Sequence, residues 1–336
     1  MSDDAQAPHK PLLDMLTAGW RTRILYEAVR LGLIDALGDT PQASVTLAQE
    51  RGLDADAVRR LLRALATIGI CQQAESDAFT LTPLGRGLRS DAPSSLRGVA
   101  LHWGDRLWES LGTLGDTLQT GLPRMSSDPA DFARMQADPE RAAVFNRAMA
   151  EQSLGVGEAV ARAYDFSRFQ TIMDVGGGYG AMLAAILAYY PTLTGWSFDM
   201  PVIEEAARAW LAERGLGERA GYRGGSFFEA VPAGADCLIL KYILHDWGDD
   251  NAHTLLTRCR AALGPDGVML IVERVLPEIV GAEDEASVRG DLIMLTVGGK
   301  ERTEREYRAL LGEAGLALRT IVPAGQGFSI LEAVPA

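Results

Sequence analysis

Apolar and polar positions in the first 100 residues follow a helical pattern that ends in two extended pieces. Residues 44–48 place a hydroxyl before a short helix, and Asp54 stands where it would cap a second one. Residues 69–82 predict two extended pieces around a polar turn, with Phe79 and Leu81 alternating. This order of helix, turn, helix and hairpin is typical of a winged helix. One face of the second helix carries Val58, Leu61, Leu62, Leu65 and Ile68.

Two functions fit such a module: DNA binding by a regulator, or dimerisation. The second helix carries Arg59, Arg60 and Arg63, which a DNA-reading helix could use, but acidic residues surround them. The whole chain has 45 acidic and 32 basic residues, a formal net charge of −13. That balance opposes binding to phosphate backbones and to anionic lipid. The charge balance therefore disfavours DNA binding, and we expect no nucleic-acid or membrane partner.

Residues 95–165 also predict helices, and the pattern changes near residue 168. From there, apolar runs of strand length alternate with amphipathic helical stretches. This alternation predicts an α/β fold, a mainly parallel sheet with helices on both faces. Thr303 and Glu306 are spaced as the capping box of a late helix that buries Tyr307, Leu310 and Leu311. The expected strands are 171–175, 194–198, 235–240 and 268–272, and other expected helices include 181–190 and the stretch around Leu255 to Leu263.

The three cysteines, Cys71, Cys237 and Cys259, are too few and too scattered for a disulfide framework or a zinc site. Cys237 and Cys259 lie in apolar stretches, so we expect them to be small core residues. The first residues lack a basic-then-apolar signal pattern, and no apolar run reaches about 18 residues. We expect a cytoplasmic protein.

A glycine loop at 174–180 joins the first expected strand to the first helix of the sheet region. Glycines there permit a sharp turn and let a ligand approach backbone amides, although tight turns also need glycine structurally. Asp199 ends the second strand, where a carboxylate can accept from both hydroxyls of a ribose. Together these features predict a nucleoside-containing ligand. The loop alone leaves a dinucleotide possible, but Asp174 within the first strand favours S-adenosylmethionine.

The next candidate is His245, one of only four histidines. It follows the strand 235–240, beside Asp246 and Trp247, and ligands bind beyond the carboxyl ends of such strands. We interpret His245 as catalytic. The acidic run 249–251 could hold Mg²⁺, but it also fits a helix N-terminus, which is the stronger interpretation, and we expect no metal site.

At this point the sequence resembles the plant caffeic-acid-type O-methyltransferases and their bacterial relatives that act on polyketides and other natural products. The matching motifs are DVGGGYG (174–180), FDMP (198–201), GGSFFEAVP (224–232), LKYILHDW (240–247), ERVLPE (273–278) and GGKERTE (298–304), with FNRAM (145–149) before them. The resemblance spans nearly the whole chain.

The resemblance implies a Rossmann-like class I methyltransferase sheet over 166–336, a winged-helix dimerisation domain over 1–100, and a helical connection lining the acceptor pocket over 101–165. It implies a homodimer, and a small aromatic acceptor methylated by S-adenosylmethionine, which becomes S-adenosylhomocysteine. The catalytic residues would be His245 as base, flanked by Glu273 and Glu301. Cofactor-binding residues would be Asp174, Gly176, Gly177, Gly178, Asp199, Met200, Ser226, Phe227 and Lys241. Acceptor-binding residues would be Asn146, Met149, Asp246, Trp247 and Met294.

The implied chemistry agrees with the residues. A phenol has a pKa of about 10 and imidazole one of about 6.5, so a neutral His245 could take the phenolic proton during methyl transfer. Glu273 and Glu301 could orient the ring and stabilise the imidazolium. One departure is Ser226, where relatives often carry Asp against the adenine amine; serine can still accept a hydrogen bond.

Three alternatives remain open. A protein of this fold could bind the cofactor and catalyse hydroxylation, decarboxylation or a pericyclic reaction instead. The winged helix could regulate transcription while the α/β domain senses a ligand. The acceptor could be an amine, which would need little or no base.

Overall fold

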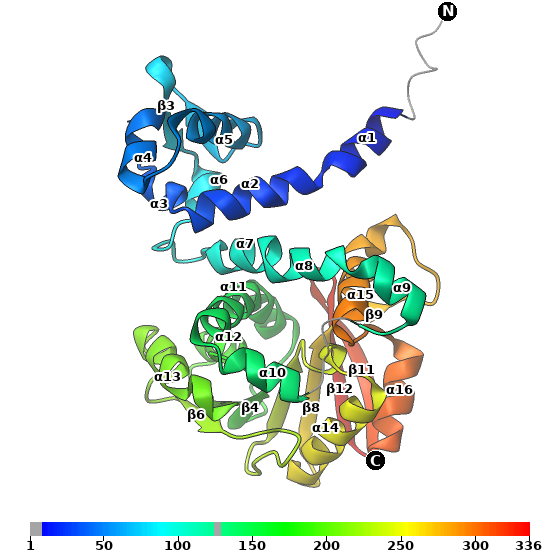
Figure 1. Ribbon diagram of the computed structural model, residues 1–336. Coiled ribbons are helices and arrows are strands. Elements are labelled where there is room, and N and C mark those ends of the chain that lie inside the picture. Colours follow the sequence, from blue (N-terminus) through cyan, green and yellow to red (C-terminus); the bar gives the residue numbers. More distant parts are fainter. Residues whose placement is uncertain (1–8, 124–128) are drawn as a thin grey trace, which may run out of the picture. The chain divides into compact units, whose positions relative to one another are not determined.

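The computed structural model describes residues 9–123 and 129–336, and the chain forms two compact units, residues 1–108 and 109–336 (Figure 1). Helix α8 (Arg106–Gly112) spans the boundary between them. The finer division at residues 100 and 165 stays a prediction. No helix of the described ranges is long and apolar enough to span a membrane.

The first unit contains the predicted helix, helix and hairpin. Asp54 caps α5, its side chain accepting from the Ala57 amide at 2.8 Å, and Val58, Leu62 and Leu65 are buried. A short strand completes a three-stranded antiparallel sheet in the order β1-β3-β2. The elements are α1 (His9–Thr17), α2 (Gly19–Arg30), α3 (Leu33–Ala36), β1 (Gln42–Ala43), α4 (Ser44–Arg51), α5 (Ala55–Thr67), β2 (Cys71–Gln73), β3 (Ala78–Leu81), α6 (Pro83–Arg86) and α7 (Arg97–Gly104).

The arginines of α5 are engaged in ion pairs on their own surface. Arg59 and Arg60 pair with Asp56, and Arg63 pairs with Asp77 at 3.1 Å. These side chains therefore have acidic neighbours in space as well as in sequence.

The second unit is built around a seven-stranded sheet in the order β11-β12-β8-β7-β4-β5-β6. Strands β4 to β8 run parallel, and β12 is antiparallel to both β8 and β11. The strands are β4 (Thr171–Val175), β5 (Thr194–Asp199), β6 (Ala220–Gly224), β7 (Cys237–Lys241), β8 (Val268–Glu273), β11 (Leu316–Gly325) and β12 (Phe328–Pro335). A separate parallel pair joins β9 (Val275–Leu276) to β10 (Arg302–Thr303).

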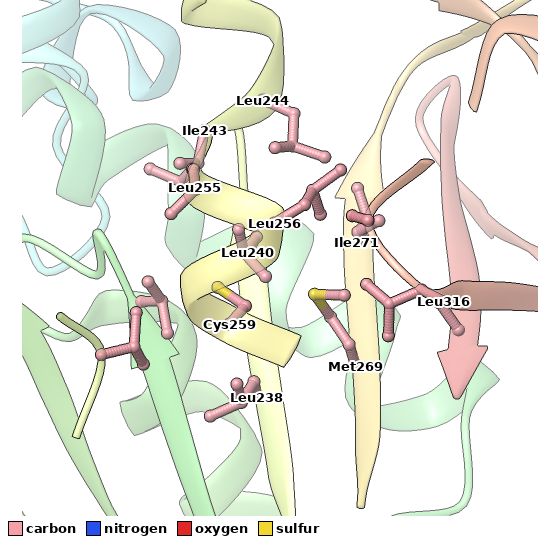
Figure 2. Packing of buried hydrophobic residues seen from close by; sticks show 14 of the residues in the cluster. Leu238, Leu240, Ile243, Leu244, Leu255, Leu256, Cys259, Met269, Ile271 and Leu316 are labelled. Carbon is pink, nitrogen blue, oxygen red and sulfur yellow. The ribbon is translucent and has the colours of Figure 1, made fainter. Parts of the chain in front are cut away.

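Helices cover both faces of this sheet, as predicted. Alternate residues of β4 divide between the two cores: Ile172 packs with α11 and α12, and Met173 with α14 and α16. Figure 2 shows Leu255 and Cys259 of α14 beside Leu240 of β7. The helices are α9 (Leu114–Thr120), α10 (Pro129–Gln136), α11 (Pro139–Ala163), α12 (Ala181–Tyr189), α13 (Glu204–Glu213), α14 (Asp249–Ala262), α15 (Glu285–Val297) and α16 (Glu304–Glu313).

The four predicted strands are present, and β7 begins at Cys237 rather than Ala235. Cys237 and Cys259 are fully buried free thiols, so their assignment to the core is confirmed. Strands β6, β11 and β12 were not predicted. In β6 the sequence AGYRG carries two glycines and little β-forming signal. Strand β11 is an edge strand whose sequence, LALRTIVPAG, does not alternate apolar with polar residues, and most of its side chains are half-buried or exposed.

The strand order defines where a ligand would bind. The chain passes from β4 to β5 and β6 on one side, then returns to β7 and β8 on the other. The carboxyl ends of β4 and β7 therefore border the crevice at which such sheets bind ligands. The loops that follow these strands begin at Gly176 and Tyr242.

Candidate active site

The glycine loop after β4 is shaped by its neighbours. Gly176 has φ +73°, and a Cβ there would lie 2.4 Å from the Ile243 side chain. A Cβ on Gly177 would lie 2.6 Å from the carboxylate of Asp174. Gly178 has φ +54° and nothing within 4 Å of its Cβ position. Two of the three glycines are thus required by packing, while the third borders open space.

Asp199 at the end of β5 is tied to that loop. Its Oδ2 accepts from the Gly178 amide at 2.8 Å and its Oδ1 from the Met200 amide at 2.7 Å. Burial raises the pKa of Asp199, and the two amides oppose that rise. Each carboxylate oxygen has one further lone pair. The site can therefore accept hydrogen bonds from a vicinal diol such as that of ribose.

Asp174 and Lys241 lie at the ends of the neighbouring strands β4 and β7. The Lys241 ammonium donates to Ser153 Oγ of α11 at 3.0 Å, and its charge acts on Asp174. Burial raises the pKa of Asp174 to about 7, opposed by Lys241. Burial likewise lowers the pKa of Lys241 to about 8, opposed by Asp174. Asp174 Oδ2 is buried and accepts no hydrogen bond within the described chain, which marks it as a place for a ligand donor.

Aromatic side chains lie beside the glycine loop. Phe227 packs edge-on against Phe228 at 4.8 Å and against Trp247 at 6.1 Å, between ring centroids. Phe227 Cε1 is 3.5 Å from the Cβ position of Gly176. Ser226 Oγ accepts from the Phe228 amide at 3.3 Å and so caps the turn. The predicted adenine-side residues are therefore next to the loop and to one another.

His245 lies in a short 3₁₀ turn, Leu244–Asp246, after β7 and is buried. Its Nδ1 is 2.9 Å from Glu301 Oε1, and its Nε2 is 3.4 Å from Asp246 Oδ1. A carboxylate only accepts, and the Glu301 contact is the shorter of the two, so in the neutral ring Nδ1 carries the proton and Nε2 holds the lone pair. Burial by itself lowers the pKa of His245, but the carboxylates of Glu301 and Asp246 outweigh it and raise the pKa to about 9.

Glu273 does not bond to the imidazole ring in this geometry. Its Oε1 accepts from the backbone amides of Ile243, Leu244 and His245 at 3.0, 2.7 and 3.2 Å. Its Oε2 accepts from the Tyr307 hydroxyl of α16. The two predicted flanking carboxylates thus differ: Glu301 holds the ring, and Glu273 holds the backbone that carries it.

A buried arginine, Arg302, also supports the loop that carries His245. Arg302 is fully buried and donates to the Leu244 and Trp247 carbonyls, each at 2.9 Å. It also donates to Asp249 Oδ1 at 2.8 Å, and Lys300 pairs with Oδ2 of that carboxylate at 3.2 Å. Asp249 is the first residue of α14. Within the described residues, no group of three His, Cys, Asp or Glu side chains could hold a metal ion.

The residues predicted on the acceptor side are spread over two helices and the His245 loop. Asn146 on α11 forms a reciprocal amide pair with Gln136 on α10, with contacts of 2.9 and 3.2 Å. Met149 on α11 and Met294 on α15 are half-buried. Asp246 keeps 38% of its side chain exposed, whereas Trp247 is buried with its Nε1 donor unpaired in the described chain. Their contact with an acceptor stays a prediction.

Sequence reasoning missed several residues that build this site. Tyr307 was assigned only to the core, and Arg302, Ser153, Gln136 and Tyr242 were given no role. Arg302 and Tyr307 lie within or just after the GGKERTE motif, so their closeness to Glu301 was the available signal. Ser153 and Gln136 offer no such motif.

Comparison with known proteins identifies the family of this chain. An O-methyltransferase domain model matches residues 115–317, and an O-methyltransferase dimerisation domain model matches residues 13–91. The chain belongs to the O-methyltransferase family. It is similar to the phenazine O-methyltransferase of Lysobacter antibioticus, with 40% identity over 96% of this chain and 95% of the relative. It is also similar to the mitomycin biosynthesis 6-O-methyltransferase of Streptomyces lavendulae, with 36% identity over 96% of this chain and 93% of that one.

A solved structure, that of LaPhzM, matches with a TM-score of 0.92 and 39% identity, covering 97% of this chain and 98% of that one. The predicted family, the methyltransferase sheet and the enzymatic class are therefore confirmed: the protein is an S-adenosylmethionine-dependent O-methyltransferase.

Proposed function

We propose that this O-methyltransferase methylates a phenolic hydroxyl of a small aromatic natural product, with His245 as general base. The observation that carries the proposal is the His245–Glu301 contact of 2.9 Å at Nδ1. It leaves Nε2, on the opposite side of the ring, as the atom able to accept a proton. Phenazine and mitomycin chemistry in the relatives' names supports an aromatic acceptor.

The residues around the glycine loop fit S-adenosylmethionine. Asp199 can accept from ribose hydroxyls, the orphaned Asp174 Oδ2 can accept from an ammonium group, and Phe227 and Ser226 can contact adenine. The proposed cofactor site is completed by Gly176, Gly177, Gly178, Met200 and Lys241. When bound, S-adenosylmethionine supplies an electrophilic methyl group on a sulfonium.

The chain's own contribution is to hold the acceptor oxygen and remove its proton. Neutral His245 accepts the hydroxyl proton at Nε2 as the oxygen–methyl bond forms and the methyl–sulfur bond breaks. Glu301 then faces an imidazolium, whose charge its carboxylate stabilises. The aromatic acceptor is proposed to be positioned by Asn146, Met149, Asp246, Trp247 and Met294. Alignment of the reacting atoms supplies much of the rate acceleration.

We also propose that the protein acts as a homodimer through its first unit. Helix α1 buries none of its residues within the described chain and exposes Leu12, Leu13, Met15 and Leu16 by 55–75%. An isolated apolar helix of this kind is typical of an association surface. Light scattering after size exclusion tests this: a dimer is expected, and a monomer at micromolar concentration contradicts it.

The decisive experiment is a mass-shift assay with S-adenosylmethionine and a panel of phenols, naphthols, hydroxyphenazines and aromatic amines. Wild type should add the mass of one methyl group to at least one hydroxyl compound, and His245→Gln should lose about 10²–10⁴-fold in rate while still binding S-adenosylhomocysteine. His253→Gln on α14 is the matched control and should keep full activity. Methylation that survives in His245→Gln contradicts the base, and methylation of amines alone contradicts the phenolic acceptor. Tight cofactor binding without any methylation favours the non-methylating alternative.

A further inference from the structure

The imidazole of His245 has a third neighbour besides Glu301 and Asp246. The ring of Tyr242 lies parallel to it, with ring centroids 4.3 Å apart and an angle of 3° between the planes. Tyr242 is the first residue after β7, three positions before the histidine. Glu301 therefore holds one edge of the imidazole, and Tyr242 covers one of its faces.

Tyr242 adopts a backbone conformation that few side chains accept. Its φ is +55°, and it is one of three non-glycine residues with positive φ in the described chain. Such a conformation is uncommon for a bulky residue and persists where the surrounding structure fixes it. Here the left-handed backbone at position 242 lets the Tyr242 ring lie over the imidazole of His245, three residues later in the chain.

The phenol is held in place from a different part of the sheet. Tyr242 Oη accepts from Arg274 Nε at 2.8 Å, and Arg274 Nη1 donates to the Gln326 carbonyl at 3.1 Å. The Arg274 guanidinium also lies over the Phe328 ring at 4.7 Å, and Phe328 packs against Tyr242 at 4.8 Å. Burial raises the pKa of Tyr242 to about 12, so the phenol stays neutral and can accept this bond. The turn between β11 and β12 thereby fixes the plane of the tyrosine.

We infer that Tyr242 is a positioning residue for His245, which fixes the plane of the imidazole and stabilises its protonated form. The inference rests on the proposed role of His245 as the base. A hydrogen bond at Nδ1 fixes one atom of the ring, but the terminal torsion of histidine has a broad minimum, so the plane needs a second contact. The face of a neutral phenol is electron-rich and attracts a cation placed over it. Both effects act at the moment when His245 takes the proton.

Other charged groups also act on the His245 ring. Glu301, Asp246 and Glu273 raise its pKa, and the Lys241 ammonium lies 4.4 Å from the centroid of the Tyr242 ring. None of these four groups has a hydrogen bond to Tyr242 in the described chain, whereas Arg274 does and loses it whether position 242 becomes Phe or Asn. A change in the titration of His245 on substitution of Tyr242 therefore reports the stacked ring.

The test uses nuclear magnetic resonance titration of ring-labelled histidine in the complex with S-adenosylhomocysteine. The chain has four histidines, so the spectrum is simple, and His245→Gln assigns the resonance. Tyr242→Phe keeps the aromatic face. Tyr242→Asn removes it while tolerating the left-handed backbone, since asparagine is enriched at positive φ. Tyr189→Asn is the matched control, at a tyrosine of α12 that is 55% exposed.

We expect Tyr242→Asn to lower the pKa of His245 by about 0.5–1 unit and Tyr242→Phe to leave it within about 0.3 unit. With the best phenol of the panel, kcat of Tyr242→Asn on the high-pH plateau, where His245 is deprotonated in both proteins, should fall about tenfold. An unchanged pKa in Tyr242→Asn overturns the inference, and so does an equal fall in Tyr242→Phe. Tyr242→Met replaces the asparagine variant if that variant does not bind S-adenosylhomocysteine.

Failure of this inference is distinguishable from failure of the proposed function. If His245→Gln stays active, the general base is wrong whatever position 242 does to the titration. If His245→Gln is inactive and Tyr242→Asn titrates like wild type, the base stands and the role of Tyr242 is wrong.

Discussion

Glu301 and Arg302 are neighbours in the chain and hold the loop of His245 in two different ways. Glu301 bonds to the Nδ1 edge of the imidazole at 2.9 Å, and Arg302 bonds to the carbonyls of Leu244 and Trp247 on either side of it. Glu301 therefore determines which ring nitrogen carries the proton, and Arg302 fixes the backbone on either side of the histidine.

The first prediction concerns the charge of Glu301. Its carboxylate raises the pKa of His245, and the base works only when deprotonated, so activity should rise with pH through a value near 9 in the free enzyme. Glu301→Gln removes that charge, so the rise should move to lower pH while the plateau falls about 10–100-fold. The measurement is kcat/KM against pH. Glu304→Gln, at an exposed residue of α16, should leave the profile unchanged, and an unmoved profile in Glu301→Gln contradicts the assignment.

The second prediction concerns Glu273, whose carboxylate accepts from the backbone amides of the His245 loop. Glu273→Gln replaces a charged acceptor of three backbone amides and one hydroxyl with a neutral amide that has a single acceptor oxygen, so the variant should lose about 2–4 kcal/mol of unfolding free energy. Tyr307→Phe removes a single donor and should cost about 1–2 kcal/mol. Urea unfolding measures both. Glu278→Gln, 61% exposed, should change stability by less than about 0.5 kcal/mol. A loss in Tyr307→Phe that exceeds the loss in Glu273→Gln would contradict this account.

The third prediction concerns cofactor affinity. Asp199→Asn turns one acceptor oxygen into a donor facing the proposed diol, so S-adenosylhomocysteine should bind about 10–100-fold more weakly. Titration calorimetry measures the change. Asp266→Asn, in the exposed turn before β8, is the control. Equal affinities for wild type and Asp199→Asn would remove Asp199 from the proposed site.

The fourth prediction separates packing from ligand binding in the glycine loop. A Cβ on Gly177 would lie 2.6 Å from the Asp174 carboxylate and from Ser197 Oγ, so Gly177→Ala should cost about 1–3 kcal/mol of stability without any ligand. Gly112→Ala, where nothing lies within 4 Å, should be neutral to slightly stabilising. Thermal unfolding of the ligand-free protein compares them. Similar unfolding temperatures for the two variants would show that the loop has room for a side chain.

The sequence predicted the sheet because its central strands are continuous apolar runs between helices. It also predicted where His245, Asp174 and Asp199 would gather, since parallel strands bring their carboxyl ends to one edge. Strand β11 was missed because an edge strand buries few side chains and shows little pattern. The parts played by Glu273 and Tyr307 were also missed, because a hydrogen bond between residues 34 positions apart leaves no local signal.

Three side chains that hold the His245 loop by hydrogen bonds come later in the chain than the loop itself. The separations from the loop are 28 residues for Glu273, 56 for Glu301 and 58 for Arg302. During synthesis the histidine thus leaves the ribosome well before these three groups, and domains fold as units once their elements are present. The glycine loop follows an earlier strand and Asp199 ends another, but the three groups that hold the proposed base come from the last quarter of the chain. A truncated translation product would therefore contain His245 without them.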